Sequence, residues 1–292
     1  MDLVLIRHPP VDVPSGVCYG QTDLALRRDV GTQVTDLAAE ADRRAPSIAA
    51  PGMDSLTRTV ASIKQHFQQR GPVLACFASP LRRCADVAHA LTGADTNTGT
   101  GTGSGAVTDT GTATRSEARP AEHARFPAAP VIDPRLSEID FGQWEMQRWD
   151  DIPRDQIDRW AADVLHERPH HGESAHMLAE RCGSWLHDLS LQFDSQTAAA
   201  PACDDDTTRA CVVVIGHAGP IRLLTALALG MPLMATLQWP LDFGGIVTLR
   251  RDRRSHAFAS ATEASAAHAA SAARRTPGAR LSAAWTLRQW NG

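Results

Sequence analysis

The chain has 292 residues, 43% of them hydrophobic, and a formal net charge of -4 at pH 7. This composition suits a globular protein with a sizeable core, and the negative charge argues against a general nucleic-acid binder. No apolar stretch is long enough to span a bilayer and the start of the chain has no signal-peptide pattern, so we expect a cytoplasmic protein without a membrane partner. The six cysteines lack C-x-x-C spacing and are expected to be reduced thiols.

Apolar runs typical of buried strands alternate with helical patterns along the chain. Strands are predicted at 3–8, 73–80, 244–252 and 282–291, and a strand, a turn and a helix share residues 209–232. Helical spacing of apolar residues predicts further helices at 30–44, 53–71 and 81–93. This alternation indicates an α/β fold, a three-layer αβα sandwich with a mostly parallel sheet.

Polar stretches interrupt this pattern without suggesting a second domain. The first of them is rich in Gly and Thr, with almost nothing to bury, so it cannot offset the entropy lost on ordering. We expect a single domain over residues 1–292, with disordered or irregular insertions at 93–120, 194–209 and 253–280.

Histidines and arginines follow three of the predicted strands. Arg7 and His8 end the first strand, Arg82 and Arg83 lie in the first turn after the second, and His217 follows the third. Ligands of open α/β sheets bind at the carboxyl ends of strands. Neutral imidazole is a competent nucleophile near pH 7, and arginine forks neutralise phosphoryl oxygens. The pattern therefore predicts a phosphoryl-transfer site.

A site of this kind also needs an acid to protonate the leaving alcohol. The segment 134–145 offers Glu138, Asp140 and Glu145 beside aromatic residues, a setting that would raise the pKa of a carboxyl group. Glu138 and Asp140 share one face of an extended segment, so their spacing alone does not choose between them.

These residues lie in motifs that resemble the histidine phosphatase superfamily, which has the phosphoglycerate mutase-like fold. The resemblance covers nearly the whole chain apart from the insertions. Five segments carry it, in the family's order: LIRH (5–8), SPLRRC (79–84), LSEIDFGQWE (136–145), HGES (171–174) and VIGHAGPIR (214–222).

The resemblance implies a role for five residues. His8 matches the nucleophile that accepts the phosphoryl group, and Arg7, Arg83 and His217 match the groups that bind it. Glu138 matches the proton donor. The resemblance implies no cofactor and no metal.

The substrate loop differs from the family's usual pattern. Pro9 replaces the glycine that normally follows the histidine, which removes a backbone N–H. The following segment, 16–26, is similar to the C-Y-G-x-T-D-x-P-L segment of α-ribazole phosphatases, and it places Gln21 and Thr22 near the substrate. Ala218 is also expected at the substrate, and it stands where the acid-phosphatase and phytase branch carries Asp.

The histidine-rich segment 166–176 suggests a metal site at first sight. His166 and His170 have i,i+4 spacing, but Pro169 disfavours the helix that would bring them together. We expect a solvated loop there, and we expect the nearby tryptophans to serve the core or a pocket wall.

The expected function is hydrolysis of a small phosphomonoester through a phosphohistidine, with α-ribazole 5′-phosphate of cobalamin synthesis as the first substrate to consider. Two alternatives remain open: phosphoryl transfer of the phosphoglycerate mutase type, and a non-catalytic phospholigand-binding protein on the same fold. The sequence leaves the oligomeric state open.

Overall fold

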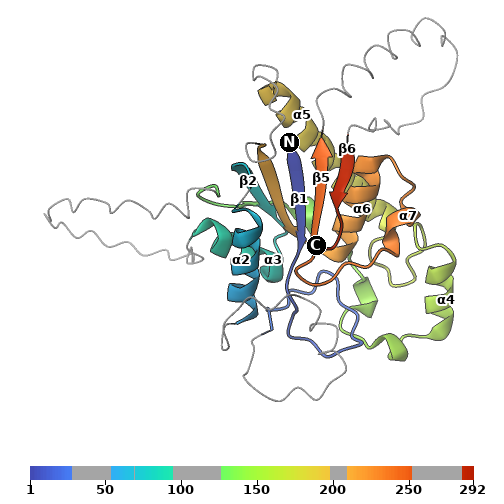
Figure 1. Cartoon of the computed structure of the whole chain (residues 1–292). Helices are drawn as coiled ribbons and strands as arrows, with labels where there is room; N and C mark the ends of the chain where they lie inside the picture. The colour runs from blue at the N-terminus through green and yellow to red at the C-terminus, as the bar shows by residue number, and fades with distance from the viewer. Residues whose placement is uncertain (28–53, 69, 95–125, 198–208, 252–284) are drawn as a thin grey trace, which may run out of the picture.

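The computed structural model describes residues 1–27, 54–68, 70–94, 126–197, 209–251 and 285–292 (Figure 1). The predicted helix at 30–44 and most of the three predicted insertions lie outside these residues. Within them, no helix is both long enough and apolar enough to cross a membrane.

A six-stranded sheet in the order β3-β2-β4-β1-β5-β6 forms the centre of the fold. β1 and β4 pair in parallel, as do β4 and β2, and β2 and β3. β5 and β6 instead add an antiparallel edge next to β1. The prediction of a mostly parallel sheet is confirmed for the half that contains the predicted site. The strands are β1 (Asp2–Arg7), β2 (Val73–Ala78), β3 (Val131–Ile132), β4 (Cys211–Gly216), β5 (Ile246–Arg251) and β6 (Trp285–Gln289).

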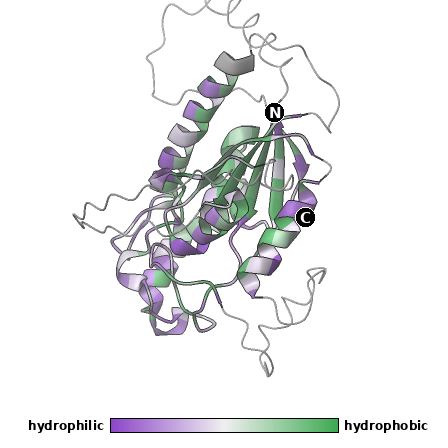
Figure 2. Cartoon of the chain, turned by 90° about the vertical axis from the view of Figure 1, so that its left-hand side faces the viewer, coloured by the Kyte–Doolittle hydropathy of each residue, from purple (hydrophilic) through white to green (hydrophobic). Residues whose placement is uncertain are grey.

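Helices cover both faces of this sheet, which confirms the three-layer sandwich. Leu3 and Leu5 of β1 belong to the core under α5 (Ala175–Thr197) and α6 (Ala218–Leu229). Val4 and Ile6 point the other way, because side chains alternate along a strand. They join the core under α2 (Ser55–His66) and α3 (Arg82–Thr92). Figure 2 shows the hydrophobic strands between the two helical layers.

Three helix ends carry residues suited to capping, although α2 ends at His66, before the predicted end at residue 71. Gly93 ends α3 and Gly230 ends α6, with φ of 69° and 64° in the left-handed region that glycine adopts readily. Asp54 begins α2 and accepts a hydrogen bond from the backbone N–H of Thr57.

Three described helices were not predicted from the sequence: α4 (Arg154–Ala162), α5 and α7 (Met234–Leu237). The prediction that an insertion begins at 194 is wrong in its first residues, since α5 continues to Thr197. Helical spacing was readable in α5, where Leu178, Cys182, Trp185 and Leu189 are buried. α4 has no buried residue, so its apolar pattern carried little signal.

The parallel strands bring the predicted site residues to one edge of the sheet. The backbone N–H of His8 donates to the Gly216 carbonyl at 3.0 Å, and that of Ser79 donates to the Ile215 carbonyl at 3.2 Å. The segments that follow β1, β2 and β4 therefore begin side by side, although more than 60 residues separate each from the next in sequence.

Candidate active site

His8 lies immediately after β1, and its side chain is buried. Its Nδ1 donates to the backbone carbonyl of Pro9 at 2.7 Å. Because a carbonyl oxygen can only accept, this bond places the imidazole proton on Nδ1 and leaves the Nε2 lone pair unprotonated. Proline at position 9 lacks an N–H but keeps the carbonyl that this contact uses.

The surroundings of His8 favour its neutral form. Burial is the largest cause that lowers its pKa well below the ordinary value of 6.5, and the charges of Arg83 and Arg7 lower it further. The hydrogen bond to the Pro9 carbonyl acts in the opposite direction but is outweighed. At neutral pH, His8 is thus an uncharged imidazole with a free Nε2.

His217 follows β4 and lies beside His8, with ring centroids 5.0 Å apart. Its Nδ1 accepts from Nε of Arg83 at 3.2 Å, so this nitrogen is unprotonated, because arginine only donates. Its Nε2 therefore carries the proton and lies 2.8 Å from the Ser79 hydroxyl. Burial, followed by the neighbouring His8 and Arg83, lowers the pKa of His217 well below 6.5.

Arg83 is the second residue of α3, the helix after β2, and is fully buried. Besides its bond to His217, it donates from Nη1 to the Thr22 carbonyl at 2.8 Å and from Nη2 to the Gly20 carbonyl. These contacts use three of the five N–H groups of a guanidinium. The other two make no hydrogen bond within the described part of the chain, which suits a second, anionic partner.

Glu145 holds the loop that contacts Arg83. Its carboxylate accepts from the backbone N–H groups of Gly20, Gln21, Thr22 and Phe141, and from the Thr22 hydroxyl. Burial alone would raise the pKa of Glu145, but these hydrogen bonds outweigh burial and lower it. Glu145 is therefore an ionised anchor of the loop, and its oxygens are already occupied.

Glu138 and Asp140 have different surroundings, which the sequence could not show. Glu138 accepts from the N–H of Ile139 at 2.9 Å and from that of Gly219, at the start of α6, at 3.3 Å. A Cβ on residue 219 would lie 2.3 Å from Oε1 of Glu138, so any larger residue there would displace the carboxylate from this position. Asp140 instead accepts from the N–H of Gly142 at 2.7 Å and supports a local turn.

Arg7 is the last residue of β1 and directly precedes His8. Its guanidinium carbon is 3.8 Å from the centre of the Phe243 ring, and Nη1 donates to the Leu241 carbonyl. Its Nε is buried and has no hydrogen-bond partner among the residues that the structure describes. Burial lowers the pKa of Arg7, but a guanidinium stays charged, so this donor fits an anion.

The predicted substrate-binding residues lie at the rim of this cluster. Gln21 is exposed and donates from Nε2 to the Glu138 carbonyl at 3.2 Å. The hydroxyl of Thr22 donates to Glu145, so its side chain serves the loop. Ala218 is the first residue of α6 and is partly buried.

The four histidines of 166–176 lie in different surroundings. His170 is fully buried against Trp144, with ring centroids 4.9 Å apart, so the prediction of a solvated loop is wrong at this residue. His166 pairs with Asp163, and no group of three His, Cys, Asp or Glu residues suited to a metal ion occurs in the described ranges. The buried Trp144 confirms the interpretation of that tryptophan as a core residue.

Several neighbours of the site were not found from the sequence. Ser79 contacts His217, Phe243 packs on Arg7 and His8, and Tyr19 lies 5.6 Å from the Arg83 guanidinium. Ser79 lies in the SPLRRC motif (79–84) and Tyr19 lies in segment 16–26. Both segments resemble the family, so the sequence did contain a signal for these two residues. Phe243 lies in a loop after α7, and nothing in its local pattern indicated a place beside β1.

Comparison with known proteins gives one family and one fold. The family model of the histidine phosphatase superfamily (branch 1) matches residues 112–263, just over half of the chain. The adenosylcobalamin/α-ribazole phosphatase of Escherichia coli (strain K12) is 28% identical over 116 residues. That match covers 39% of this chain and spans half the length of the relative.

Two solved structures share the fold across most of both chains. A mycobacterial glucosyl-3-phosphoglycerate phosphatase matches with a TM-score of 0.58 at 18% identity, covering 99% of this chain and 98% of that one. The α-ribazole phosphatase of Shigella flexneri matches with a TM-score of 0.53 at 17% identity, covering 87% and 92%. At such identities the likeness speaks for the fold alone. The match to the family model, in contrast, shows that this chain belongs to the histidine phosphatase superfamily.

Proposed function

We propose that this protein is a phosphomonoesterase that hydrolyses a small phosphate ester through a phosphohistidine at His8. The observation that carries the proposal is the hydrogen bond from Nδ1 of His8 to the Pro9 carbonyl, which leaves Nε2 as a free lone pair. The lowered pKa of His8 supports the same function, because only a neutral imidazole can attack phosphorus.

In the first step, Nε2 of His8 attacks phosphorus and the bond between phosphorus and the alcohol oxygen breaks. Glu138 in its protonated form gives its proton to that oxygen, so the alcohol leaves neutral. In the second step, water attacks the phosphohistidine, Glu138 takes a proton from the water, and the P–N bond breaks. Inorganic phosphate leaves, and His8 returns to its neutral form.

Charge in the transition state is stabilised by groups already fixed in the fold. The spare N–H groups of Arg83 and the unpartnered Nε of Arg7 are suited to bind phosphoryl oxygens. His217 would contribute its Nε2 proton by exchanging the Ser79 hydroxyl for a phosphate oxygen. Its bond to Nε of Arg83 aligns the two groups.

For the substrate, we propose α-ribazole 5′-phosphate in cobalamin synthesis. The similarity of segment 16–26 to α-ribazole phosphatases supports this choice, as do the names of the relatives from Escherichia coli and Shigella flexneri. The five described cysteines are free thiols, which supports action in the reducing cytoplasm.

A panel of phosphate esters tests this substrate. We expect α-ribazole 5′-phosphate to have a higher kcat/KM than glucosyl-3-phosphoglycerate and 3-phosphoglycerate, with release of one inorganic phosphate per ester consumed. A preference for glucosyl-3-phosphoglycerate would overturn the substrate proposal but keep the phosphatase. Return of the phosphoryl group to a second hydroxyl, without release of phosphate, would identify a mutase.

The variant His8→Ala tests the nucleophile. We expect turnover to fall by about 10⁴-fold or more, because no other group supplies the covalent route. The wild-type protein should form a phosphoenzyme with ³²P-labelled substrate that survives alkali and is lost in acid, and the variant should form none. His187→Ala, which changes an exposed histidine on α5, should behave like the wild type. Turnover of His8→Ala close to the wild-type rate would contradict the mechanism.

The variant Glu138→Gln tests the proton donor. The alkoxide of an alkyl phosphate is a poor leaving group unless it is protonated, so we expect hydrolysis of this ester to fall by about 10²-fold or more. The phenolate of an aryl ester such as p-nitrophenyl phosphate leaves without a proton, so the rate of its hydrolysis should fall far less. Asp140→Asn, which changes the neighbouring carboxylate, should affect both esters mildly. Equal losses on the two esters in Glu138→Gln would show that this residue is not the acid.

A further inference from the structure

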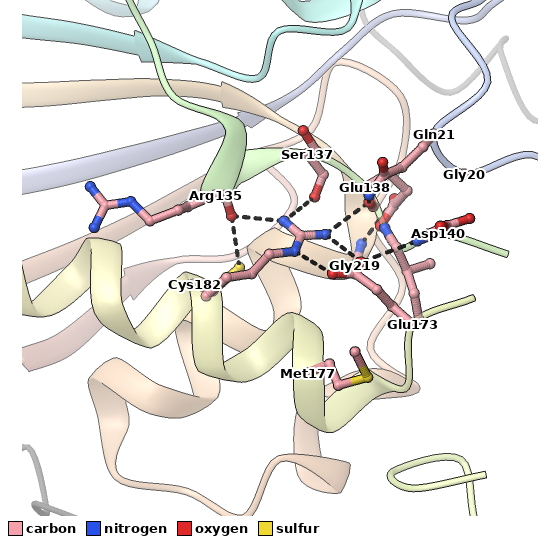
Figure 3. Close-up of polar contacts among 12 residues, drawn as sticks. Gly20, Gln21, Arg135, Ser137, Glu138, Asp140, Glu173, Met177, Cys182 and Gly219 are labelled. Atoms are coloured by element: carbon pink, nitrogen blue, oxygen red, sulfur yellow. Dashed lines mark hydrogen bonds and ion pairs between the residues drawn. The ribbon is translucent and has the colours of Figure 1, made fainter. Parts of the chain in front are cut away.

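Arg181 lies in the second turn of α5 and uses every N–H of its guanidinium in a hydrogen bond (Figure 3). Two of these bonds go to the carboxylate of Glu173, at 2.9 and 2.8 Å. The other three go to the backbone carbonyls of Arg135, Ser137 and Glu138, at 2.8, 2.7 and 2.9 Å. A single side chain thus binds the backbone at residue 135, at Ser137 and at Glu138 itself.

Leu136 and Ile139 anchor the segment that Arg181 holds in the core, but its backbone carbonyls have few other hydrogen-bond donors. The short turn η2 (Pro134–Leu136) ends there, and Ser137 is extended with ψ of 154°. Residues 137–139 belong to no strand, and among the described residues the carbonyls of Ser137 and Glu138 accept hydrogen bonds from side chains alone. Besides Arg181, only Gln21 donates to the Glu138 carbonyl within the described chain, at 3.2 Å from an exposed side chain.

Glu173 extends this support to the far side of Glu138. Its Oε2 accepts from the N–H of Asp140 at 3.2 Å, while its own N–H donates to the Asp140 carbonyl at 2.8 Å. The Glu173 carboxylate also orients the Arg181 guanidinium through two parallel bonds, a geometry in which the fork of arginine is fixed. Together, Arg181 and Glu173 hold residues 135–140 against the start of α5.

Within the described residues, the Glu138 carboxylate itself accepts two hydrogen bonds, one of them from the N–H of the next residue. Its position over Gly219 therefore depends on where the backbone of residue 138 is held. We propose that Arg181 is a positioning residue for Glu138: it fixes the backbone that aims the proton donor at the leaving oxygen. This inference rests on the proposed function, in which Glu138 is the acid.

The charge of Arg181 has a second effect that the experiment must separate. This charge helps to lower the pKa of His217, although burial and the neighbouring His8 and Arg83 contribute more. Arg181→Lys keeps this charge but removes the planar fork, because an ammonium group is a point charge with three donors. Lysine is thus the informative replacement, and alanine would mix the two effects.

The test compares kcat/KM for an alkyl phosphate and for p-nitrophenyl phosphate in Arg181→Lys, Glu138→Gln and the double variant. A misaimed acid should cost Arg181→Lys about 10-fold or more on the alkyl ester, and about twofold on the aryl ester. In the Glu138→Gln background, Arg181→Lys should cost nothing further on the alkyl ester, because the group that it aims is gone.

Arg251→Lys is the matched control. Arg251 is a buried arginine that also contacts α5, since its Nη1 donates to the Ser190 carbonyl at 3.0 Å, more than two turns beyond Arg181 along the helix. It should lower the melting temperature without changing the ratio of alkyl to aryl hydrolysis. If Arg181→Lys does not fold, Glu173→Gln gives the same reading, since it loosens the guanidinium and keeps the helix.

Equal losses on both esters in Arg181→Lys, or in Glu173→Gln where that variant replaces it, would overturn the inference and leave a merely structural residue. If the losses of kcat/KM on the alkyl ester from Arg181→Lys and Glu138→Gln combine in full in the double variant, the inference is overturned too. If Glu138→Gln alone is not selective for the alkyl ester, the assignment of the acid fails first, and the two failures are thus distinguished.

Discussion

The site depends on one hydrogen bond, from Nδ1 of His8 to the carbonyl of the next residue. This bond fixes the tautomer and the ring orientation, and it needs no side chain other than His8. A backbone carbonyl is present in every residue type, so the contact survives the replacement of the family's usual glycine by Pro9. The prolines after β1 therefore do not remove what a nucleophilic histidine requires, and they stiffen the chain where it leaves the sheet.

The remaining site groups are also held by backbone atoms from distant parts of the sequence. Carbonyls of the loop at residues 20–22 orient Arg83, and Glu145 holds that loop through its N–H groups. Carbonyls of residues 135–138 bind Arg181 in the same way. In both places a charged side chain forms hydrogen bonds with irregular backbone that belongs to no strand or helix, and these bonds hold the loop in place. The carboxyl ends of β1, β2 and β4 supply the common edge on which these loops meet.

Much of this arrangement was predictable, for identifiable reasons. Continuous apolar runs gave β1, β2 and β4, and the rule that ligands bind at strand ends grouped His8, Arg83 and His217 before any contact was known. The choice between Glu138, Asp140 and Glu145 was not predictable from spacing, because it depends on which N–H groups surround each carboxylate. Arg181 left no signal of its own, since an arginine on a helix is usually a solvated residue, and its carbonyl partners are more than 40 residues away. The antiparallel position of β5 and β6 likewise depends on tertiary pairing rather than on local pattern.

The most direct test of this account is ¹⁵N NMR of the protein with labelled histidine, with His8→Ala used to assign the signals. The account predicts that His8 is neutral, with the proton on Nδ1 and none on Nε2, at neutral pH, and that it stays neutral below pH 6.5, where an ordinary histidine is mostly charged. The lowered pKa sets this sign, because it extends the neutral form to lower pH. A proton on Nε2 of the neutral ring, or an imidazolium that forms with a midpoint near 6.5, would contradict it, since neither state leaves the lone pair that attacks phosphorus.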